Sequence, residues 1–241
     1  MAPHRTEGIV LRTRNLGEAD KILAIITPDD GKIEAVARGS RRSGSRLLSV
    51  AQPFVQARLL LQRRPHRTLD TLSQADIQNA FRPLREDLTR FAYAGVAVET
   101  ADALLPLRDP HPRVYALMQG GLELLARVEP QALDLALRAV QLKLVCMMGF
   151  RPRLDQCAGC ERPLAGEVRF SCELGGAICP DCAARDPVAL PLGTGGVAWL
   201  RRLFALEFAR LPEAAGERLP PVVSRVLNRY CEHVLERPLR S

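Results

Sequence analysis

The first 80 residues alternate short runs rich in β-branched side chains with residues that are typical of turns. The pattern predicts strands at residues 8–11, 21–26, 32–37, 53–61 and 67–77. Between the second and third runs stands Pro28-Asp-Asp-Gly31, in which proline fixes φ and glycine allows a positive φ, so a tight turn is expected there. Five short strands in succession favour a small closed barrel, of either the OB-fold or the SH3-like type.

After residue 80 the spacing of apolar residues changes from two to three or four, which is typical of amphipathic helices. The first such pattern covers residues 81–105 and ends before Pro106 and the proline-containing stretch 109–112. Further helices are expected at residues 114–128, 131–148, 194–208 and 221–235. Thr194 is a candidate N-cap, and the Pro220-Pro221 pair suits the start of the last helix.

Between the third and fourth of these helices lie two Cys-x-x-Cys pairs. They are formed by Cys157 with Cys160 and by Cys179 with Cys182. Each pair is a tight turn that aims two sulfurs at one point, and the residues between the pairs are numerous enough for a short hairpin that joins them. Four thiolates then complete a tetrahedron around one structural Zn²⁺, a geometry that leaves no position open for a substrate and argues against catalysis.

The other three of the seven cysteines have no Cys-x-x-Cys partner. Cys172 lies between the two pairs and could replace one ligand, but we interpret it as a small buried residue. Cys146 and Cys231 fall within helical patterns, where a free cysteine packs as a small hydrophobic residue. An odd count with four cysteines paired favours metal over disulfides, and a thioredoxin-like role for Cys179 and Cys182 alone is the weaker alternative.

These patterns together predict an α+β multi-domain protein with an N-terminal OB-fold barrel, a helical domain and a zinc ribbon inserted between helices. The expected boundaries are 1–79 for the barrel, 80–152 and 187–241 for the two parts of the helical domain, and 153–186 for the four-cysteine module. No apolar run is long enough to span a bilayer, and the N-terminus lacks the apolar core of a secretory signal, so a cytoplasmic protein without a membrane partner is expected.

The positive charge is concentrated in one part of the barrel sequence. The chain has a formal net charge of +7, and residues 31–69 alone contain nine Lys or Arg residues and a single acid, Glu34. Arginine forks suit phosphate, while the interleaved Gly and Ser let the backbone follow an irregular ligand. We therefore favour a phosphate-binding loop over a merely solvated one, and the candidate DNA contacts are Lys32, Arg38, Arg41, Arg42 and Arg46, with Arg63, Arg64 and Arg67 expected to extend the same face.

Aromatic side chains that could stack on bases are nearly absent from the same region. Phe54 is the single aromatic residue among the first 80. Stacking platforms for single strands depend on exposed aromatic rings. The sequence therefore predicts binding that is mainly electrostatic, indifferent to base sequence, and able to accept single- and double-stranded DNA.

Several short motifs together resemble the RecO family of bacterial recombination mediators. They are residues 7–11 (EGIVL), 17–22 (GEADKI), 27–31 (TPDDG), 37–42 (ARGSRR), 45–49 (SRLLS) and 52–54 (QPF), and, around the cysteines, 149–153 (GFRPR), 170–171 and 175–176. The resemblance is specific over residues 7–54 and 149–182, and elsewhere the order of elements agrees.

The resemblance implies an OB-fold whose basic loops contact DNA, and Cys157, Cys160, Cys179 and Cys182 as zinc ligands. It further implies a protein that is not an enzyme, that anneals complementary strands and that, with RecR, helps to load RecA onto DNA coated by single-stranded DNA-binding protein (SSB). A location on the nucleoid, within the cytoplasm, follows from such a role. The residues alone also leave open a zinc-ribbon protein that binds or modifies RNA or tRNA, or an adaptor that binds proteins, although no catalytic constellation stands out.

Overall fold

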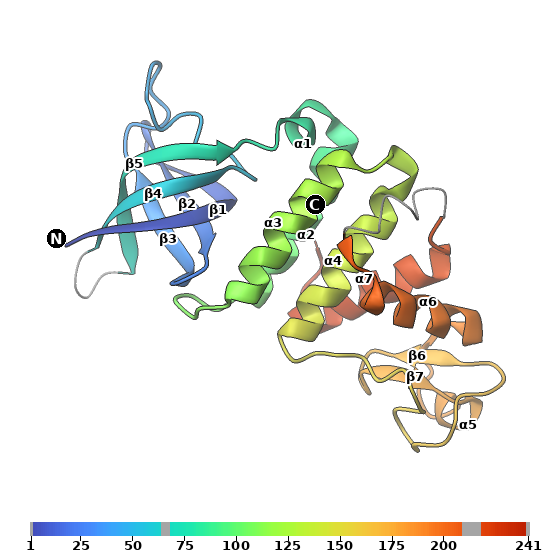
Figure 1. The fold of residues 1–241 in the computed structure, drawn as a ribbon. Coiled ribbons are helices and arrows are strands. Elements are labelled where there is room, and N and C mark those ends of the chain that lie inside the picture. The colour runs from blue at the N-terminus through green and yellow to red at the C-terminus, as the bar shows by residue number, and fades with distance from the viewer. Residues whose placement is uncertain (1, 64–67, 209–217, 240–241) are drawn as a thin grey trace. The chain divides into compact units, whose positions relative to one another are not determined.

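The computed structural model describes residues 2–63, 68–208 and 218–239, which form two compact units, residues 1–127 and 128–240 (Figure 1). Barrel and helices share the first unit, and the four-cysteine module and helices share the second. The predicted boundary at residue 79 coincides with the end of the last barrel strand, whereas that at residue 186 falls before residues 190–191, which still pair with residues 169–170. The compact units divide after residue 127. No helix within the described ranges is long and apolar enough to cross a membrane.

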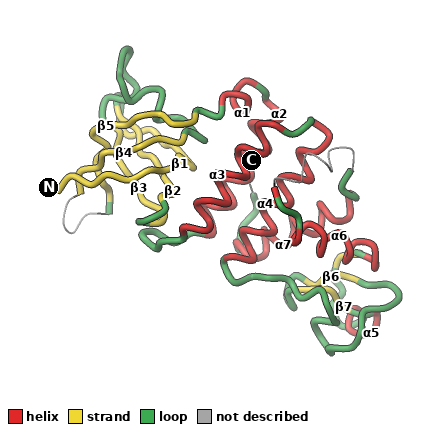
Figure 2. The backbone as a smooth tube through the Cα atoms, in the orientation of Figure 1, coloured by secondary structure: helices red, strands yellow, loops and turns green. Residues whose placement is uncertain are grey.

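Five strands close into a barrel in the first unit (Figures 1 and 2). They are β1 (Ala2–Leu16), β2 (Asp20–Thr27), β3 (Gly31–Ala37), β4 (Gln56–Arg63) and β5 (Leu69–Asn79). The order around the barrel is β1-β2-β3-β5-β4, with β3 and β5 parallel and the other neighbouring pairs antiparallel. This Greek-key barrel confirms the predicted OB-fold and the mixed α+β class.

Alternation along the strands places the apolar side chains inside the barrel. In β3 every second residue is buried, and Ile33 and Ala35 join a core that also contains Leu23, Ile25 and Leu61. β1 is much longer than the predicted run at 8–11. Its first half pairs with β4 and its second half with β2, and a bulge between Val10 and Arg12 bends the strand where it changes partner.

Two strand boundaries differ from the prediction for a local reason. β4 begins at Gln56 and not at residue 53, because Phe54 has a φ of +72°, which a strand cannot contain. β5 continues to Asn79, two residues beyond the predicted end, because these residues still pair with β4.

Three helices complete the first unit: α1 (Arg82–Glu86), α2 (Leu88–Leu104) and α3 (Pro112–Arg127). The single helix predicted over 81–105 was wrong in one respect, because Asp87 interrupts it with an extended backbone at φ −119°. Asp87 instead serves as the N-cap of α2, its carboxylate accepting a hydrogen bond from the Arg90 N–H at 3.0 Å.

Side chains of α2 hold this helix against the barrel. The Asp102 carboxylate accepts from the Arg12 Nε of β1 at 2.7 Å and lies 3.3 Å from the Lys32 Nζ of β3. Just beyond α2, the Arg108 N–H donates to the Lys32 carbonyl at 2.8 Å. The end of α2 and the segment after it therefore cover part of the outer face of β1 and β3.

In the second unit, helices pack around one central helix, α4 (Leu133–Met147), which is nearly fully buried. The elements of this unit are η1 (Pro130–Ala132), α4, β6 (Arg169–Ser171), β7 (Gly176–Ile178), α5 (Pro180–Ala183), β8 (Leu190–Pro191), α6 (Gly193–Ala205) and α7 (Pro221–Leu235). α7 has the predicted bounds. The expected cap by Thr194 was wrong, because α6 already begins at Gly193 and Thr194 lies within its first turn; the helix also ends at Ala205, before residue 208.

Candidate metal centre and nucleic-acid surface

The four predicted metal ligands meet at one point in the second unit. The β6–β7 hairpin returns the chain so that Cys179, at the start of α5, lies beside the turn that carries Cys157 and Cys160. The sulfurs of these residues and of Cys182 all lie within 4.8 Å of one another, and those of Cys160 and Cys179 are 3.7 Å apart. A tetrahedral site with Zn–S bonds of about 2.3 Å needs sulfurs about 3.8 Å apart, so the donor set fits such an ion.

Donors around the cluster favour the thiolate form of two of its sulfurs, those of Cys157 and Cys160. The Arg162 Nε donates to the Cys160 Sγ at 3.3 Å and lowers the pKa of that thiol to about 6. The Cys179 N–H donates to the Cys157 Sγ, also at 3.3 Å. The Cys182 thiol donates hydrogen bonds to the sulfurs of Cys157 and Cys160, and these bonds raise its pKa to about 12. A cation at the centre of the cluster would favour its thiolate instead. The cluster thus has the chemistry of a metal site.

The remaining cysteines lie outside this cluster, as the sequence predicts. Cys172 and Cys146 are half-buried, and Cys231 is fully buried on α7. Burial raises the pKa of all three thiols, to about 11 for Cys146 and about 12 for Cys231. They remain protonated thiols at neutral pH and pack as apolar groups.

The arginine-rich segment, residues 38–46, is an ordered series of turns at one end of the barrel. The carboxylate of Asp20 accepts the Gly39 N–H at 2.7 Å. Arg41 makes two bonds to the β1–β2 turn: its N–H donates to the Ala19 carbonyl at 2.9 Å, and its Nη1 donates to the Gly17 carbonyl at 2.8 Å. The beginning of the segment is therefore fixed to the rim of the barrel.

The following residues anchor the far end of the same loop. Val50, Ala51 and Val55 belong to the barrel core, and the Lys21 Nζ donates to the Ala51 carbonyl at 2.9 Å. Phe54 is buried at 1% exposure, has a positive φ, and donates its N–H to the Val10 carbonyl at 2.8 Å. We call residues 38–55 the arginine loop; both of its ends are held by the barrel.

The four arginines of the loop, Arg38, Arg41, Arg42 and Arg46, are all exposed. Residues 38–55 contain no acid, so no carboxylate within the loop competes for the guanidinium groups. A further exposed arginine, Arg14 of β1, lies near this end of the barrel, two residues before the Leu16–Asp20 pair that closes the β1–β2 ladder. Sequence reasoning missed Arg14, although its alternation with Arg12 along the strand could have shown that both point outward.

Lys32 differs from the loop arginines in its surroundings. Its side chain is 13% exposed, and its ammonium group is bonded to the carbonyl oxygen and the carboxylate of Asp102. An amine held in this way is poorly placed to meet a phosphate. Its contact with DNA stays a prediction, and we leave it out of the surface proposed below.

The structure places Arg63 at the opposite end of the strands from the arginine loop. It pairs with Ala2 across the β1–β4 ladder and forms an ion pair with Asp30 of the β2–β3 turn. It therefore does not extend the face formed by the loop. Arg64 and Arg67, predicted to join it, lie outside the described residues.

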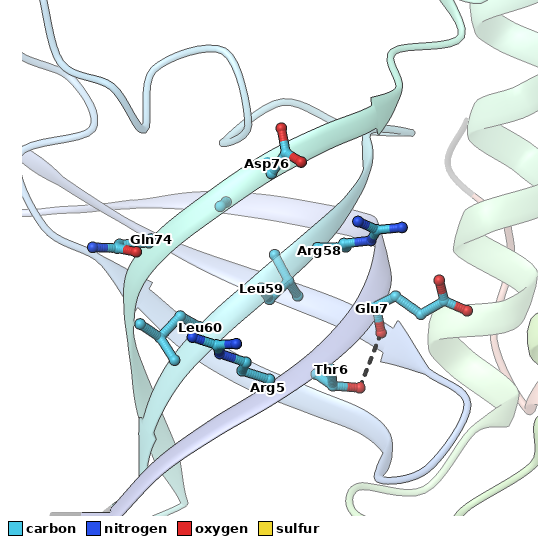
Figure 3. Close-up of a pocket in the computed structure, with 9 residues that line it drawn as sticks. Arg5, Thr6, Glu7, Arg58, Leu59, Leu60, Gln74 and Asp76 are labelled. Carbon is cyan, nitrogen blue, oxygen red and sulfur yellow. Dashed lines mark hydrogen bonds between the residues drawn. The ribbon is translucent and has the colours of Figure 1, made fainter.

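A shallow hollow of about 500 Å³ lies on the outer wall of β1, β4 and β5, a site that the sequence did not indicate (Figure 3). Arg5 and Arg58 line it together with Glu7 and Asp76, so its charges balance. The Thr6 hydroxyl donates to the Glu7 carbonyl at 3.2 Å. Because phosphate requires an excess of positive charge, this wall is a poorer nucleic-acid surface than the arginine loop.

Comparison with known proteins gives matches over nearly the whole chain. The family model described as "Recombination protein O N terminal" matches residues 1–81, and that described as "Recombination protein O C terminal" matches residues 85–241. A protein of Symbiobacterium thermophilum named "DNA repair protein RecO" is 42% identical over all of this chain and 96% of its own length. Proteins of the same name from Pelotomaculum thermopropionicum and Moorella thermoacetica are 35% and 36% identical, over 100% and 98% of this chain and 93% and 88% of theirs.

Proposed function

The chain belongs to the RecO family of DNA repair and recombination proteins, and we propose that it binds single- and double-stranded DNA through the arginine loop and anneals complementary strands. The observation that carries this proposal is the loop itself. Four exposed arginines stand in a segment without acids, and hydrogen bonds and buried side chains fix both of its ends. A surface that is ordered before binding loses little entropy when phosphates dock on it.

Annealing requires that the repulsion between two phosphate backbones be screened while the pairing edges of the bases stay free. Arginine forks bind phosphate oxygens and leave those edges untouched. The one aromatic residue of the barrel sequence, Phe54, is buried and packs edge-on against Phe91, with ring centroids 5.3 Å apart, so it offers no stacking platform. The surface is therefore suited to screening the repulsion between phosphates, and not to stacking bases on aromatic rings.

Family membership supports the finer parts of the proposal. We propose that the protein acts with RecR and SSB to load RecA, that it has no enzymatic activity of its own, and that it works in the cytoplasm on the nucleoid. We further propose that the four-cysteine cluster holds one Zn²⁺ with a structural role, because four thiolates of this spacing suit Zn²⁺ and fill its coordination shell. The RNA-directed alternative has less support, since the similar proteins are named for DNA repair.

The test uses the double variant Arg41→Gln/Arg42→Gln. If the four loop arginines each neutralise one phosphate, log K for duplex DNA falls against log salt with a slope of about −4, and the variant reduces this to about −2. We expect its annealing rate at low salt, followed by fluorescence quenching of labelled complementary strands, to fall about tenfold, because two fewer phosphates are neutralised.

The matched control is Arg82→Gln/Arg113→Gln, which removes the same charge from two exposed arginines on α1 and α3. We expect it to keep a slope near that of the wild type. Equal loss in both double variants would mean that net charge alone matters, and an unchanged slope in Arg41→Gln/Arg42→Gln would remove the loop from the DNA surface.

A further inference from the structure

Two leucines are exposed at the end of the barrel that carries the arginine loop. Leu48 of the loop is 41% exposed, and Leu16, the last residue of β1, is 40% exposed. Single exposed apolar side chains are common on protein surfaces. These two differ in that Leu48 belongs to the arginine loop and Leu16 is adjacent to Gly17, whose carbonyl binds the Arg41 guanidinium.

The backbone fixes Leu48 outward. Its neighbour Leu47 packs against the barrel core, and the Ala51 N–H donates to the Leu47 carbonyl at 2.9 Å. The Leu48 N–H donates to the Ser45 carbonyl at 3.1 Å, which closes a turn. Leu48 therefore cannot exchange places with Leu47 without breaking the anchor of the loop.

Leu16 is fixed by the strand ladder. It pairs with Asp20 across the β1–β2 turn, and the adjacent Gly17 carbonyl accepts the Arg41 guanidinium at 2.8 Å. Because side chains two residues apart in a strand share a face, Leu16 and the exposed Arg14 project from the same side of the sheet. Leu16 is thus an exposed apolar side chain one residue from the carbonyl that binds the Arg41 guanidinium, and two residues from Arg14, which pairs with Glu34 at 3.8 Å.

We propose that Leu16 and Leu48 pack against the faces of unpaired bases in a strand whose phosphates are held by the arginine loop. This inference rests on the proposed function and deepens it. A DNA strand is a polyanion with flat apolar base faces, and apolar side chains of DNA-binding proteins pack on such faces or wedge between base steps. In a duplex those faces are stacked on one another, and exposing them costs a few kcal/mol per step.

The charge of the loop selects this occupant over a protein. A protein partner that covered the leucines would also have to neutralise four arginines that have no acid within the loop. A single strand supplies a partner for both kinds of side chain: a phosphate of each nucleotide for the arginines, and the apolar face of a base for the leucines. Contacts to base faces also leave the pairing edges free, as annealing requires.

The experiment compares an oligonucleotide of natural thymidines with one of equal length that carries abasic sites at its central positions. The abasic strand keeps every phosphate and lacks the base faces. We expect wild-type protein to bind the natural strand about fivefold to tenfold more tightly, and Leu16→Ser/Leu48→Ser to bind both strands with the affinity that wild type has for the abasic one. The salt slope of the variant stays that of the wild type, because no ionic contact is lost.

Leu88→Ser is the matched control, since Leu88 is 85% exposed on α2 and lies outside the loop. It should bind both strands as wild type does, and the thermal unfolding of both leucine variants should be unchanged.

Equal loss on natural and abasic strands, or no loss at all, would overturn the leucine contact while leaving the proposed function intact. The proposed function fails separately if Arg41→Gln/Arg42→Gln has an unchanged salt slope.

Discussion

Gly31, the first residue of β3, combines a positive φ with a close approach of the backbone. Its φ is +66°, and an added Cβ would lie 1.9 Å from the carbonyl oxygen of Asp109. We expect Gly31→Ala to push the segment after α2 away from the barrel and to lower the free energy of unfolding by about 3 kcal/mol or more. Urea unfolding followed by circular dichroism measures this.

Gly17→Ala is the control that separates the two causes. Gly17 also has a positive φ, +59°, but an added Cβ meets nothing within 4 Å. Its substitution should therefore cost only the conformational strain, about 1 kcal/mol. Equal costs at the two positions would show that the contact with Asp109 is not what requires glycine at residue 31.

At the scale of single residues, the sequence predicted the cysteines better than the basic side chains. Two Cys-x-x-Cys pairs specify their own partners, because only a common metal or a disulfide explains that spacing. Lys32 and Arg38 look alike in the sequence as basic residues. What separates them is Asp102, which is 70 positions away from Lys32 and becomes its neighbour only once α2 packs on the barrel.

At the scale of the element, the arginine loop depends on an acid that would by itself repel DNA. The Asp20 carboxylate accepts the Gly39 N–H at 2.7 Å and so holds the first turn of the loop. We expect Asp20→Ala to loosen that turn, because losing one such hydrogen bond costs about 1 kcal/mol, which corresponds to about a fivefold larger open population. Limited trypsin digestion, with cleavage after Arg38, Arg41, Arg42 or Arg46 identified by mass spectrometry, measures the opening.

Asp20→Asn is the matched control, since its amide oxygen can still accept from Gly39 while its charge is gone. Its loop should resist trypsin as the wild type does, and its affinity for DNA should rise because a negative charge has left the phosphate-binding surface. Rapid cleavage of both variants would indicate that the charge of Asp20, and not its hydrogen bond, orders the loop.

Helices and strands were predictable where a pattern of apolar residues is continuous, and less so where a single residue changes the backbone. The closed barrel, the hairpin between the cysteine pairs and the bounds of α7 followed from spacing and turn residues. Asp87 and Phe54 set boundaries that spacing does not reveal. Each takes part in a hydrogen bond that the spacing cannot show: the Asp87 carboxylate accepts the Arg90 N–H, and the Phe54 N–H donates to the Val10 carbonyl, 44 positions earlier in the chain.

Across the whole molecule, the arginine loop and the cysteine cluster lie in segments of opposite charge. The arginine loop belongs to the first unit, and the cysteine cluster to the second. Residues 153–186 contain six acids and four arginines, and four thiolates around a divalent cation add two negative charges. A segment of that charge repels phosphate. The cysteine module is therefore better suited to stabilising its own unit than to binding DNA.

This division predicts what loss of the metal does to the intact protein. In Cys157→Ser/Cys160→Ser the remaining two thiolates cannot close a tetrahedron, and the hairpin that depends on it loses its fastening to the turn before it. We expect zinc content by atomic absorption to fall to near zero and the midpoint of thermal unfolding to fall by about 10 °C or more. Affinity for single-stranded DNA at 20 °C should stay within about twofold of wild type, because the arginine loop takes no part in the cluster.

Cys172→Ser, which alters a half-buried cysteine outside the cluster, should retain both zinc and stability. If the double variant instead kept its unfolding midpoint and lost DNA binding, the roles assigned to the two units would have to be exchanged.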